Sequence, residues 1–321
     1  MVSHIHQIVA SDFTALNRMV VDQLHSDVPL IESIGHYIIE AGGKRMRPVL
    51  VLLASRNLGY AGKDHIELAT VIEFLHTATL LHDDVVDMSE MRRGRPTANT
   101  HWDNPSSVLV GDFIYSRAFE LLVGIGDMAI MDVMASTTNK ISEGEVLQLV
   151  NQRNPRATEA DYMQVILNKT AILFAAACKS AAILAGADDK IRDNLHNFGL
   201  QVGLAFQLVD DVLDYSGSSD TMGKNVGDDL AEGKPTLPLI HAMQHGSESE
   251  RSLIEKAITS GGLEHLDTII NTVKDSGALD YTRDKASQCI DSALTCLDCL
   301  PDNEFRTGLV QVAEAALHRD S

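Results

Sequence analysis

The chain carries the stretch Leu80-Leu81-His82-Asp83-Asp84-Val85-Val86-Asp87, and a similar stretch recurs as Leu208-Val209-Asp210-Asp211-Val212-Leu213-Asp214. Both copies place the pattern Asp-Asp-x-x-Asp at the end of an apolar run. If each run is a helix, its first and last aspartates share one face, because residues four apart are neighbours there. Like charges at this spacing destabilise a helix, so the pattern predicts that bound cations compensate them.

Apolar residues recur with helical spacing on both sides of these stretches. Glycine and proline interrupt the pattern, as at Gly42-Gly43 and Asn104-Pro105, and no Asn-Gly pair joins two alternating apolar runs. We therefore expect an all-α fold without a β-sheet. No low-complexity linker divides the chain, which favours a single domain over residues 1–321. The expected helices include 66–87, 108–123, 128–151, 161–187, 190–214, 237–243, 250–260, 263–276, 279–300 and 302–319.

The charge balance is strongly acidic, with 45 Asp and Glu against 26 Lys and Arg and a formal net charge of −19. Such a balance argues against a nucleic acid as partner, because phosphate backbones need a basic surface. Residues 1–10 lack the basic and apolar regions of a secretory signal, and residues 171–187 contain Lys179 and Ser180 within an apolar run. We expect a buried soluble helix there and a cytoplasmic protein.

The aspartates suit a hard divalent cation. Magnesium takes oxygen ligands, usually few carboxylates together with substrate phosphates and water. Asp83 and Asp87 on one helix, with Asp210 and Asp214 on another, predict magnesium ions with a diphosphate between them. The alternative is a charged surface patch at each helix end, and the second copy of the pattern makes this alternative less favourable.

Basic residues gather where a diphosphate would need them. The loop Gly42-Gly43-Lys44-Arg45-Met46-Arg47-Pro48 precedes an apolar run, and Arg92-Arg93-Gly94-Arg95 follows the first aspartate pattern. Arginine binds phosphate with two parallel hydrogen bonds, and lysine offers a compact charge. For Arg45 and Arg95, a phosphate contact and an ordinary surface charge remain equally open. Further cations along the chain are Lys169 (beside Thr170), Lys224 and Lys234.

These motifs, in this order over residues 42–238, resemble the trans-type polyprenyl diphosphate synthases, and the helical remainder is similar as well. The likeness is greatest to long-chain members that make an octaprenyl (C40) product. The resemblance implies a single isoprenoid-synthase-type helical bundle with a deep central cavity. It also implies an enzyme that elongates an allylic diphosphate, such as farnesyl diphosphate, with isopentenyl diphosphate by 1'-4 head-to-tail condensation. The product would serve as a quinone side chain.

The resemblance also implies a role for each matching residue. Asp83, Asp87 and Asp210 would hold magnesium, three ions in all, and Asp84, Asp211 and Asp214 would support them. The diphosphate of isopentenyl diphosphate would bind Lys44, Arg47, His76 and Arg93. The allylic substrate, or the carbocation formed from it, would meet Arg92, Lys169, Thr170, Gln207, Lys224 and Lys234. The oxygens of Thr170 and Gln207 would stabilise that cation, and the released diphosphate would accept the proton.

Product length is expected to depend on the residues four and five before Asp83, which are Thr79 and Ala78. They lie roughly 6–8 Å further along the same helix. The resemblance implies that bulky side chains there close the product tunnel and that small ones leave it open, which favours a long product. Phe119, Met131 and Met134 are candidates for the end of the tunnel, and C45 or C50 products stay open.

Three other interpretations compete. A terpene cyclase shares the fold but usually places Asn, Ser or Thr and Glu in its second motif, where this chain has Asp210, Asp211 and Asp214. A membrane prenyltransferase would need several apolar spans. A non-catalytic subunit of a heteromeric synthase tends to lose one aspartate motif or the Lys44–Arg47 pair, and both are intact here. The resemblance further implies a homodimer, and the apolar product implies transient contact with a membrane surface.

Overall fold

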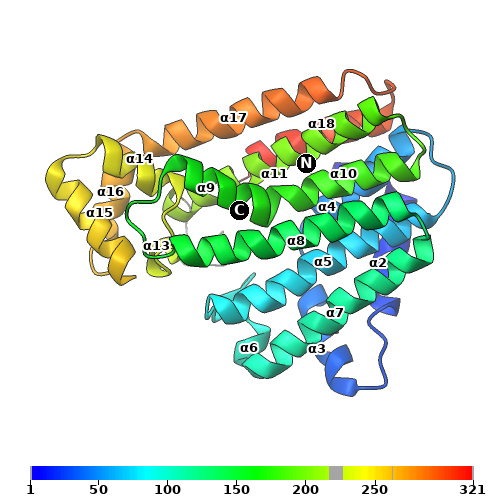
Figure 1. The fold of residues 1–321 in the computed structure, drawn as a ribbon, viewed down its shortest axis with the longest axis horizontal. Coiled ribbons are helices and arrows are strands. Elements are labelled where there is room, and N and C mark those ends of the chain that lie inside the picture. The colour runs from blue at the N-terminus through cyan, green and yellow to red at the C-terminus, as the bar shows by residue number, and fades with distance from the viewer. Residues whose placement is uncertain (1, 217–226, 262, 320–321) are drawn as a thin grey trace.

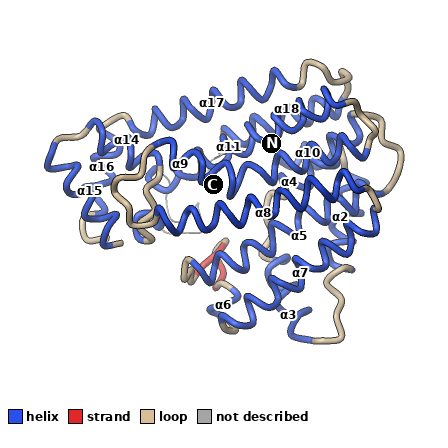
Figure 2. The backbone as a smooth tube through the Cα atoms, viewed as in Figure 1, coloured by secondary structure: helices blue, strands red, loops and turns tan. Residues whose placement is uncertain are grey.

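The computed structural model describes residues 2–216, 227–261 and 263–319. Nearly all of them form helices, which lie side by side in an elongated bundle (Figures 1 and 2). The helices are α1 (Val2–Ile8), α2 (Ala10–Asp22), α3 (Pro29–Glu40), α4 (Met46–Asn57), α5 (Asp64–Val86), α6 (Ala98–His101), α7 (Asn104–Ile125), α8 (Met128–Asn151), α9 (Glu159–Ile166), η1 (Leu167–Ala171), α10 (Ile172–Leu184), α11 (Asp189–Ser216), α13 (Asp228–Ala231), α14 (Leu237–His245), α15 (Glu248–Ser260), α16 (Leu266–Asp275), α17 (Ala278–Cys296) and α18 (Glu304–Leu317).

The centre of the bundle is formed by α5, α10 and α11. Helix α5 packs against α4 and α7, while α11 packs against α10 and α17. Both aspartate motifs lie at the C-terminal ends of central helices, the first on α5 and the second on α11. Because a helix C-terminus carries partial negative charge, aspartates are unfavourable there unless positive groups approach them.

The expectation of no β-sheet is wrong in one place. Strands β1 (Met91–Arg92) and β2 (Arg95–Pro96) form a short antiparallel hairpin. Its two turn residues, Arg93 and Gly94, both have positive φ angles of 53° and 72°, as a type I′ turn requires. Glycine adopts this conformation readily but arginine rarely does, so the hairpin lacks the usual sequence signature.

The helix expected over 161–187 is interrupted. The five residues of η1 form a π-helix between α9 and α10. Such turns are rare within α-helices and frequently mark functional sites. Lys169 and Thr170 both lie in this π-helix, so the irregularity falls on two predicted site residues.

The continuous helical run Glu159–Leu184 is long and apolar enough, by length and composition, to cross a membrane. However, 78% of its apolar window is buried against the rest of the bundle, and nearly all of α10 belongs to the hydrophobic core. The apolar segment therefore serves as an interior helix, as expected from Lys179 and Ser180 within it.

Candidate active site

A cavity of about 920 Å³ lies where α5 and α11 carry their aspartates. The predicted residues that line it are Lys44, Arg47, His76, Thr79, Asp83, Asp87, Arg92, Arg93, Lys169, Thr170, Gln207, Asp210, Asp211 and Lys234. Asp84 and Asp214 are fully buried and do not line it. Lys224 lies outside the described residues. Segments far apart in the chain thus bring most of the predicted residues to one place.

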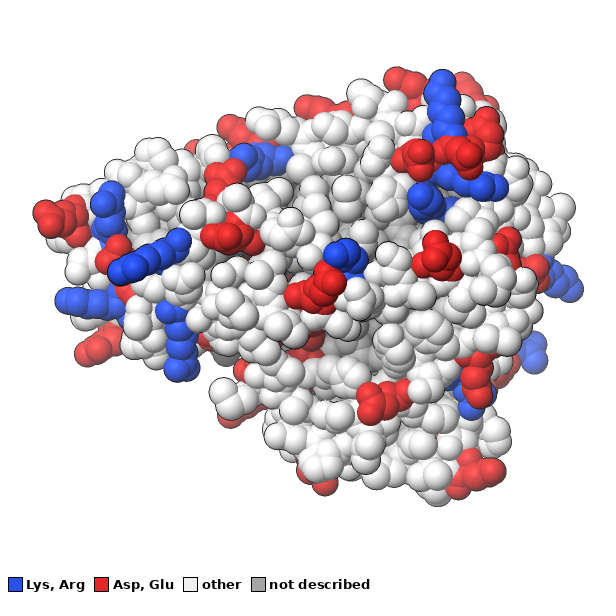
Figure 3. All heavy atoms as spheres, viewed as in Figure 1, with Lys and Arg blue, Asp and Glu red and all other residues white. Residues whose placement is uncertain are grey.

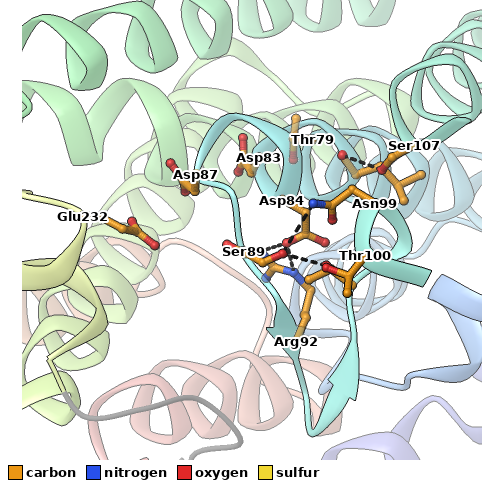
Figure 4. A network of polar contacts seen from close by, with 12 residues as sticks. Thr79, Asp83, Asp84, Asp87, Ser89, Arg92, Asn99, Thr100, Ser107 and Glu232 are labelled. Carbon is orange, nitrogen blue, oxygen red and sulfur yellow. Dashed lines mark hydrogen bonds and ion pairs between the residues drawn. The ribbon is translucent and has the colours of Figure 1, made fainter. Parts of the chain in front are cut away.

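The first aspartate motif has two faces. Asp83 and Asp87 point together toward the cavity, whereas Asp84 points toward Arg92 (Figure 4). The Arg92 Nε donates to Asp84 Oδ1 at 2.8 Å, and its Nη2 lies 2.7 Å from the same oxygen. Burial raises the pKa of Asp84, and the positive charge of Arg92 opposes this. Asp84 therefore anchors the basic hairpin to the end of α5.

Two lysines approach the cavity side of this motif. The Nζ of Lys169 lies 3.6 Å from Asp83 Oδ2 and 2.6 Å from Glu145 Oε2. The Nζ of Lys234 donates to Asp87 Oδ2 at 2.9 Å and also contacts the carboxylate of Glu232. These cations offset the unfavourable aspartates at the end of α5.

The second motif divides in a similar way. The side chain of Asp210 is partly exposed in the cavity. Asp211 accepts hydrogen bonds from the Tyr162 hydroxyl at 2.6 Å and from Gln207 Nε2 at 2.8 Å. Asp214 accepts from the backbone N–H of Asp229 at 3.3 Å, which ties α11 to the start of α13. Asp211 and Asp214 thus hold protein groups around Asp210.

Thr170 and Gln207 form one hydrogen-bonded chain with Asp211. The Thr170 hydroxyl donates to Gln207 Oε1 at 3.0 Å, and the Gln207 amide nitrogen donates onward to Asp211. The chain fixes which end of the Gln207 amide carries the oxygen, because the two ends have opposite roles. Both side chains line the cavity, and these hydrogen bonds fix the positions of their oxygens.

A second set of lining residues is basic. Arg47 Nη1 lies 3.1 Å from His76 Nε2, and the Arg47 guanidinium stacks 4.3 Å from the centre of the Phe174 ring. Burial and the neighbouring arginines, Arg47 first, keep the pKa of His76 well below its ordinary value. His76 is therefore a neutral imidazole. One of its ring nitrogens can accept a hydrogen bond, and the other can donate one to a bound anion. Lys44 and Arg93 also line the cavity.

Arg45 belongs to the cavity and Arg95 does not. Arg45 lines the cavity and donates to Glu73 Oε1 at 2.6 Å, and both side chains are only 10% exposed. Arg95 is exposed on strand β2. Arg45 thus lies where a phosphate contact is possible, whereas Arg95 has the exposure of an ordinary surface charge.

Several cavity residues were missed at the sequence level. Glu73, Glu145 and Glu232 bring acidic groups to the basic ones, and Tyr162 bonds to Asp211. Arg319 reaches the cavity from beyond α18, where its Nη2 donates to Phe206 O at 2.7 Å and lies 3.6 Å from Asp210 Oδ1. Buried charges need partners of opposite charge, so such residues could be expected. Their positions in the sequence could not be identified from this rule.

The donor set fits a divalent metal bound together with phosphate. Across the described ranges, no three His, Cys, Asp or Glu side chains are gathered into a ready-made metal site. Instead, Asp83, Asp87 and Asp210 offer carboxylate oxygens to one cavity that also has a basic wall. Magnesium typically uses few protein carboxylates and completes its shell with phosphate and water. These three residues would therefore hold the metal.

Gly144 on α8 allows this helix to approach η1 closely. A β-carbon at Gly144 would lie 2.7 Å from Lys169 N and 2.9 Å from the backbone carbon of Asn168. Gly144→Ala is therefore expected to displace Lys169 and lower kcat/KM by about 10²-fold, the usual effect of a 1 Å misplacement. Steady-state kinetics would measure the loss.

Gly124→Ala on α7 is the matched control, because its β-carbon would meet only the end of the Glu67 side chain, at 3.2 Å. It is expected to keep wild-type kinetics. Unchanged kinetics in Gly144→Ala would mean that the position of η1 is not critical.

Comparisons with known proteins agree with this geometry. The Polyprenyl synthetase family model matches residues 28–273. The octaprenyl diphosphate synthase of Escherichia coli (strain K12) is 48% identical over 317 residues, which cover 98% of each chain. An all-trans-nonaprenyl-diphosphate synthase (geranyl-diphosphate specific) of Rhodobacter capsulatus is also 48% identical, over 97% of this chain and 96% of its own.

Solved structures agree as well. A polyprenyl synthase from Caulobacter crescentus CB15, complexed with calcium and isoprenyl diphosphate, matches with a TM-score of 0.97 at 41% identity, covering 100% of this chain and 98% of that chain. A decaprenyl diphosphate synthase from Rhodobacter capsulatus matches with a TM-score of 0.94 at 42% identity over 100% of both chains. The predicted all-α isoprenoid-synthase fold is confirmed. The chain therefore belongs to the polyprenyl synthetase family of prenyl-transferring enzymes.

Proposed function

We propose that this enzyme condenses an allylic diphosphate, farnesyl diphosphate being the expected primer, with successive molecules of isopentenyl diphosphate to give octaprenyl (C40) diphosphate for a quinone side chain. The observation that carries the proposal is that one cavity is lined by two sets of groups. Aspartates and lysines form one set, and Lys44, Arg47, His76 and Arg93 form the other. Two diphosphates therefore find separate binding groups in a shared space.

The reaction follows from these groups. The bond between C1 of the allylic substrate and its diphosphate oxygen breaks, and the diphosphate leaves with the electron pair. Lys169 and Lys234 neutralise part of the charge on this leaving group. The Thr170 and Gln207 oxygens stabilise the carbocation without attacking it. The double bond of isopentenyl diphosphate then forms the new carbon–carbon bond, and the lost proton passes to the released diphosphate.

Asp83, Asp87 and Asp210 would hold three Mg²⁺ ions, whose charge offsets that of the departing diphosphate. The Arg47 and His76 pair and Arg93 would orient isopentenyl diphosphate. Arg92 lines the cavity and would contact the allylic diphosphate, and its bond to Asp84 fixes the hairpin beside the cavity. Lys224 is proposed to contact the allylic diphosphate because of the sequence resemblance.

The C40 product is supported by the octaprenyl relative at 48% identity, but the nonaprenyl relative reaches the same value. Thr79 lines the cavity, whereas Ala78 is fully buried in α5. Phe119, Met131 and Met134 do not line it. Thr79 is thus the better-placed of the two proposed length-determining residues, and a tunnel past Ala78 would require the core to open.

A homodimer is part of the proposal. Large apolar side chains are exposed along α7 and α8, which lie beside each other, and uncharged surface covers much of the face over α8 (Figure 3). Exposed apolar patches mark interaction sites. We further propose a cytoplasmic enzyme that contacts a membrane surface only transiently and binds no nucleic acid. On α7 and α8, the most exposed apolar side chains are those of Leu109 (65%), Val123 (70%), Met128 (75%), Val146 (60%) and Val150 (69%).

Incubation of the purified protein with farnesyl diphosphate, labelled isopentenyl diphosphate and Mg²⁺ tests the function. We expect a ladder of products ending near C40 after dephosphorylation and chromatography, and its loss on adding EDTA. A cyclic product would favour a terpene cyclase, and a product of another length would change the chain-length assignment. No product from the purified chain would favour the non-catalytic subunit.

A further inference from the structure

The two cavity lysines share an unusual arrangement. Each is divided between an aspartate of the first motif and a glutamate outside both motifs. Lys169 lies between Asp83 (3.6 Å) and Glu145 (2.6 Å). Lys234 lies between Asp87, at 2.9 Å, and Glu232, which it also contacts. In Figure 4, Glu232 lies across from Asp87. The same aspartate–lysine–glutamate group is thus built twice.

All six side chains are largely buried, retaining only 12–26% of their exposed surface. Removing one partner from a buried ion pair is costly, because the remaining charge is left without compensation. A divalent cation that takes Asp83 or Asp87 deprives the neighbouring lysine of one partner. The glutamate leaves that lysine with a second partner, so the exchange creates no orphaned ammonium.

Helix α8 fixes both glutamates. It carries Glu145 directly, and its C-cap residue Gln152 donates from Nε2 to Glu232 O at 2.7 Å. The backbone N–H of Arg153 donates to Gly233 O at 2.8 Å. The segment that carries Glu232 and Lys234 is therefore anchored to the same helix, so the two groups share one rigid support.

We propose that Glu145 and Glu232 are positioning residues that retain Lys169 and Lys234 in the cavity while Asp83 and Asp87 exchange these lysines for metal ions. The inference rests on the proposed function, since it takes the two aspartates as metal ligands. Each glutamate raises the metal affinity of the neighbouring aspartate without contacting the metal. It also leaves the lysine directed at the diphosphate.

Glu145→Gln and Glu232→Gln test the proposal through binding instead of turnover. Isothermal titration calorimetry of Mg²⁺ into protein saturated with inorganic diphosphate measures the dissociation constant of the metal. Each variant is expected to weaken Mg²⁺ binding about tenfold, because the lysine then competes for the aspartate alone. Glu145→Asp keeps the charge and is expected to retain most of the affinity.

A second background separates positioning from simple loss of negative charge. In Lys169→Ala, Glu145→Gln is expected to change the Mg²⁺ dissociation constant less than about twofold, because no lysine remains to be retained. Glu143→Gln is the matched control on α8, where Glu143 pairs at 2.6 Å with Lys140 on the exposed face. It is expected to bind Mg²⁺ like the wild type.

Two results would overturn the inference while leaving the proposed function intact. One is an unchanged Mg²⁺ affinity in both Glu→Gln variants, once circular dichroism has shown that both variants are folded. The other is a tenfold weakening that persists in the Lys169→Ala background. Failure of the wild-type protein to bind Mg²⁺ with diphosphate would contradict the proposed function itself, and with it this inference.

Discussion

Replacing Asp83 by alanine is expected to lower kcat by about 10³-fold, the upper end of the loss seen when one preorganised electrostatic group is removed. The side chain faces the cavity and offers carboxylate oxygens to the proposed metal. Its removal leaves Lys169 paired with Glu145 at 2.6 Å, so no buried charge is orphaned. The free energy of unfolding should therefore fall by only about 1 kcal/mol, the ordinary cost of a single substitution. Single-turnover kinetics and thermal melts would measure both quantities.

The neighbouring Asp84→Ala is expected to behave differently. Asp84 is fully buried and is bonded to Arg92, whose side chain is 29% exposed. Its loss should destabilise the fold by on the order of 2 kcal/mol, below the cost for a fully buried pair because Arg92 reaches solvent. Equal stability losses in the two variants, or substantial turnover by Asp83→Ala, would contradict the assignment of separate faces to this motif.

Arg47→Met is expected to lower kcat/KM for isopentenyl diphosphate by about 10²-fold, the value of a charge-assisted bond to phosphate. The free protein should lose no stability and can gain some. Arg47 is partly buried, and its Nε has no hydrogen-bond partner among the described residues. Burial, together with the like charges of Arg319 and Arg93, lowers the pKa of Arg47 to about 10, although Glu73 opposes this. Methionine keeps contact with the Phe174 ring.

Arg56→Met on the same helix is the matched control. Arg56 forms two bonds with the Asp12 carboxylate, at 2.6 and 2.8 Å, away from the cavity. Its replacement should destabilise the fold by on the order of 1–2 kcal/mol and leave the KM for isopentenyl diphosphate unchanged. A large loss of stability in Arg47→Met would mean that this arginine supports the fold more than it binds substrate.

Much of the site could be predicted from local sequence. Asp83 and Asp87 are four residues apart, so helical geometry alone places them on one face. The repetition of the pattern at Asp210 then indicated a shared ligand. Lys44 and Arg47 were recognisable because cations next to a diglycine loop stand out in an acidic chain. Within each motif, the informative residues lie within one or two helical turns of each other.

The missing parts depend on long-range packing. Glu145 meets Lys169 only because α8 packs against η1, and Arg319 meets Phe206 only when α18 lies beside α11. No local spacing encodes these contacts. The different roles of Asp83 and Asp84 were expected from the family resemblance, but the bond between Asp84 and Arg92 was not. This bond depends on the hairpin, which brings Arg92 to the side of α5 where Asp84 lies.

The π-helix η1 changes the rotational phase of the helix that contains it. Successive residues of an α-helix advance by about 100°, so Tyr162 and Phe174 would point about 120° apart on an uninterrupted helix. One additional residue accommodated in η1 reduces this difference to about 20°. Both residues can then face α11, where Tyr162 bonds to Asp211 and Phe174 packs near Phe206. Deleting a single residue here would restore the regular α-helical hydrogen bonds, but it would turn one half of the helix away from its partners. The number of residues in this segment is therefore as important as their identity.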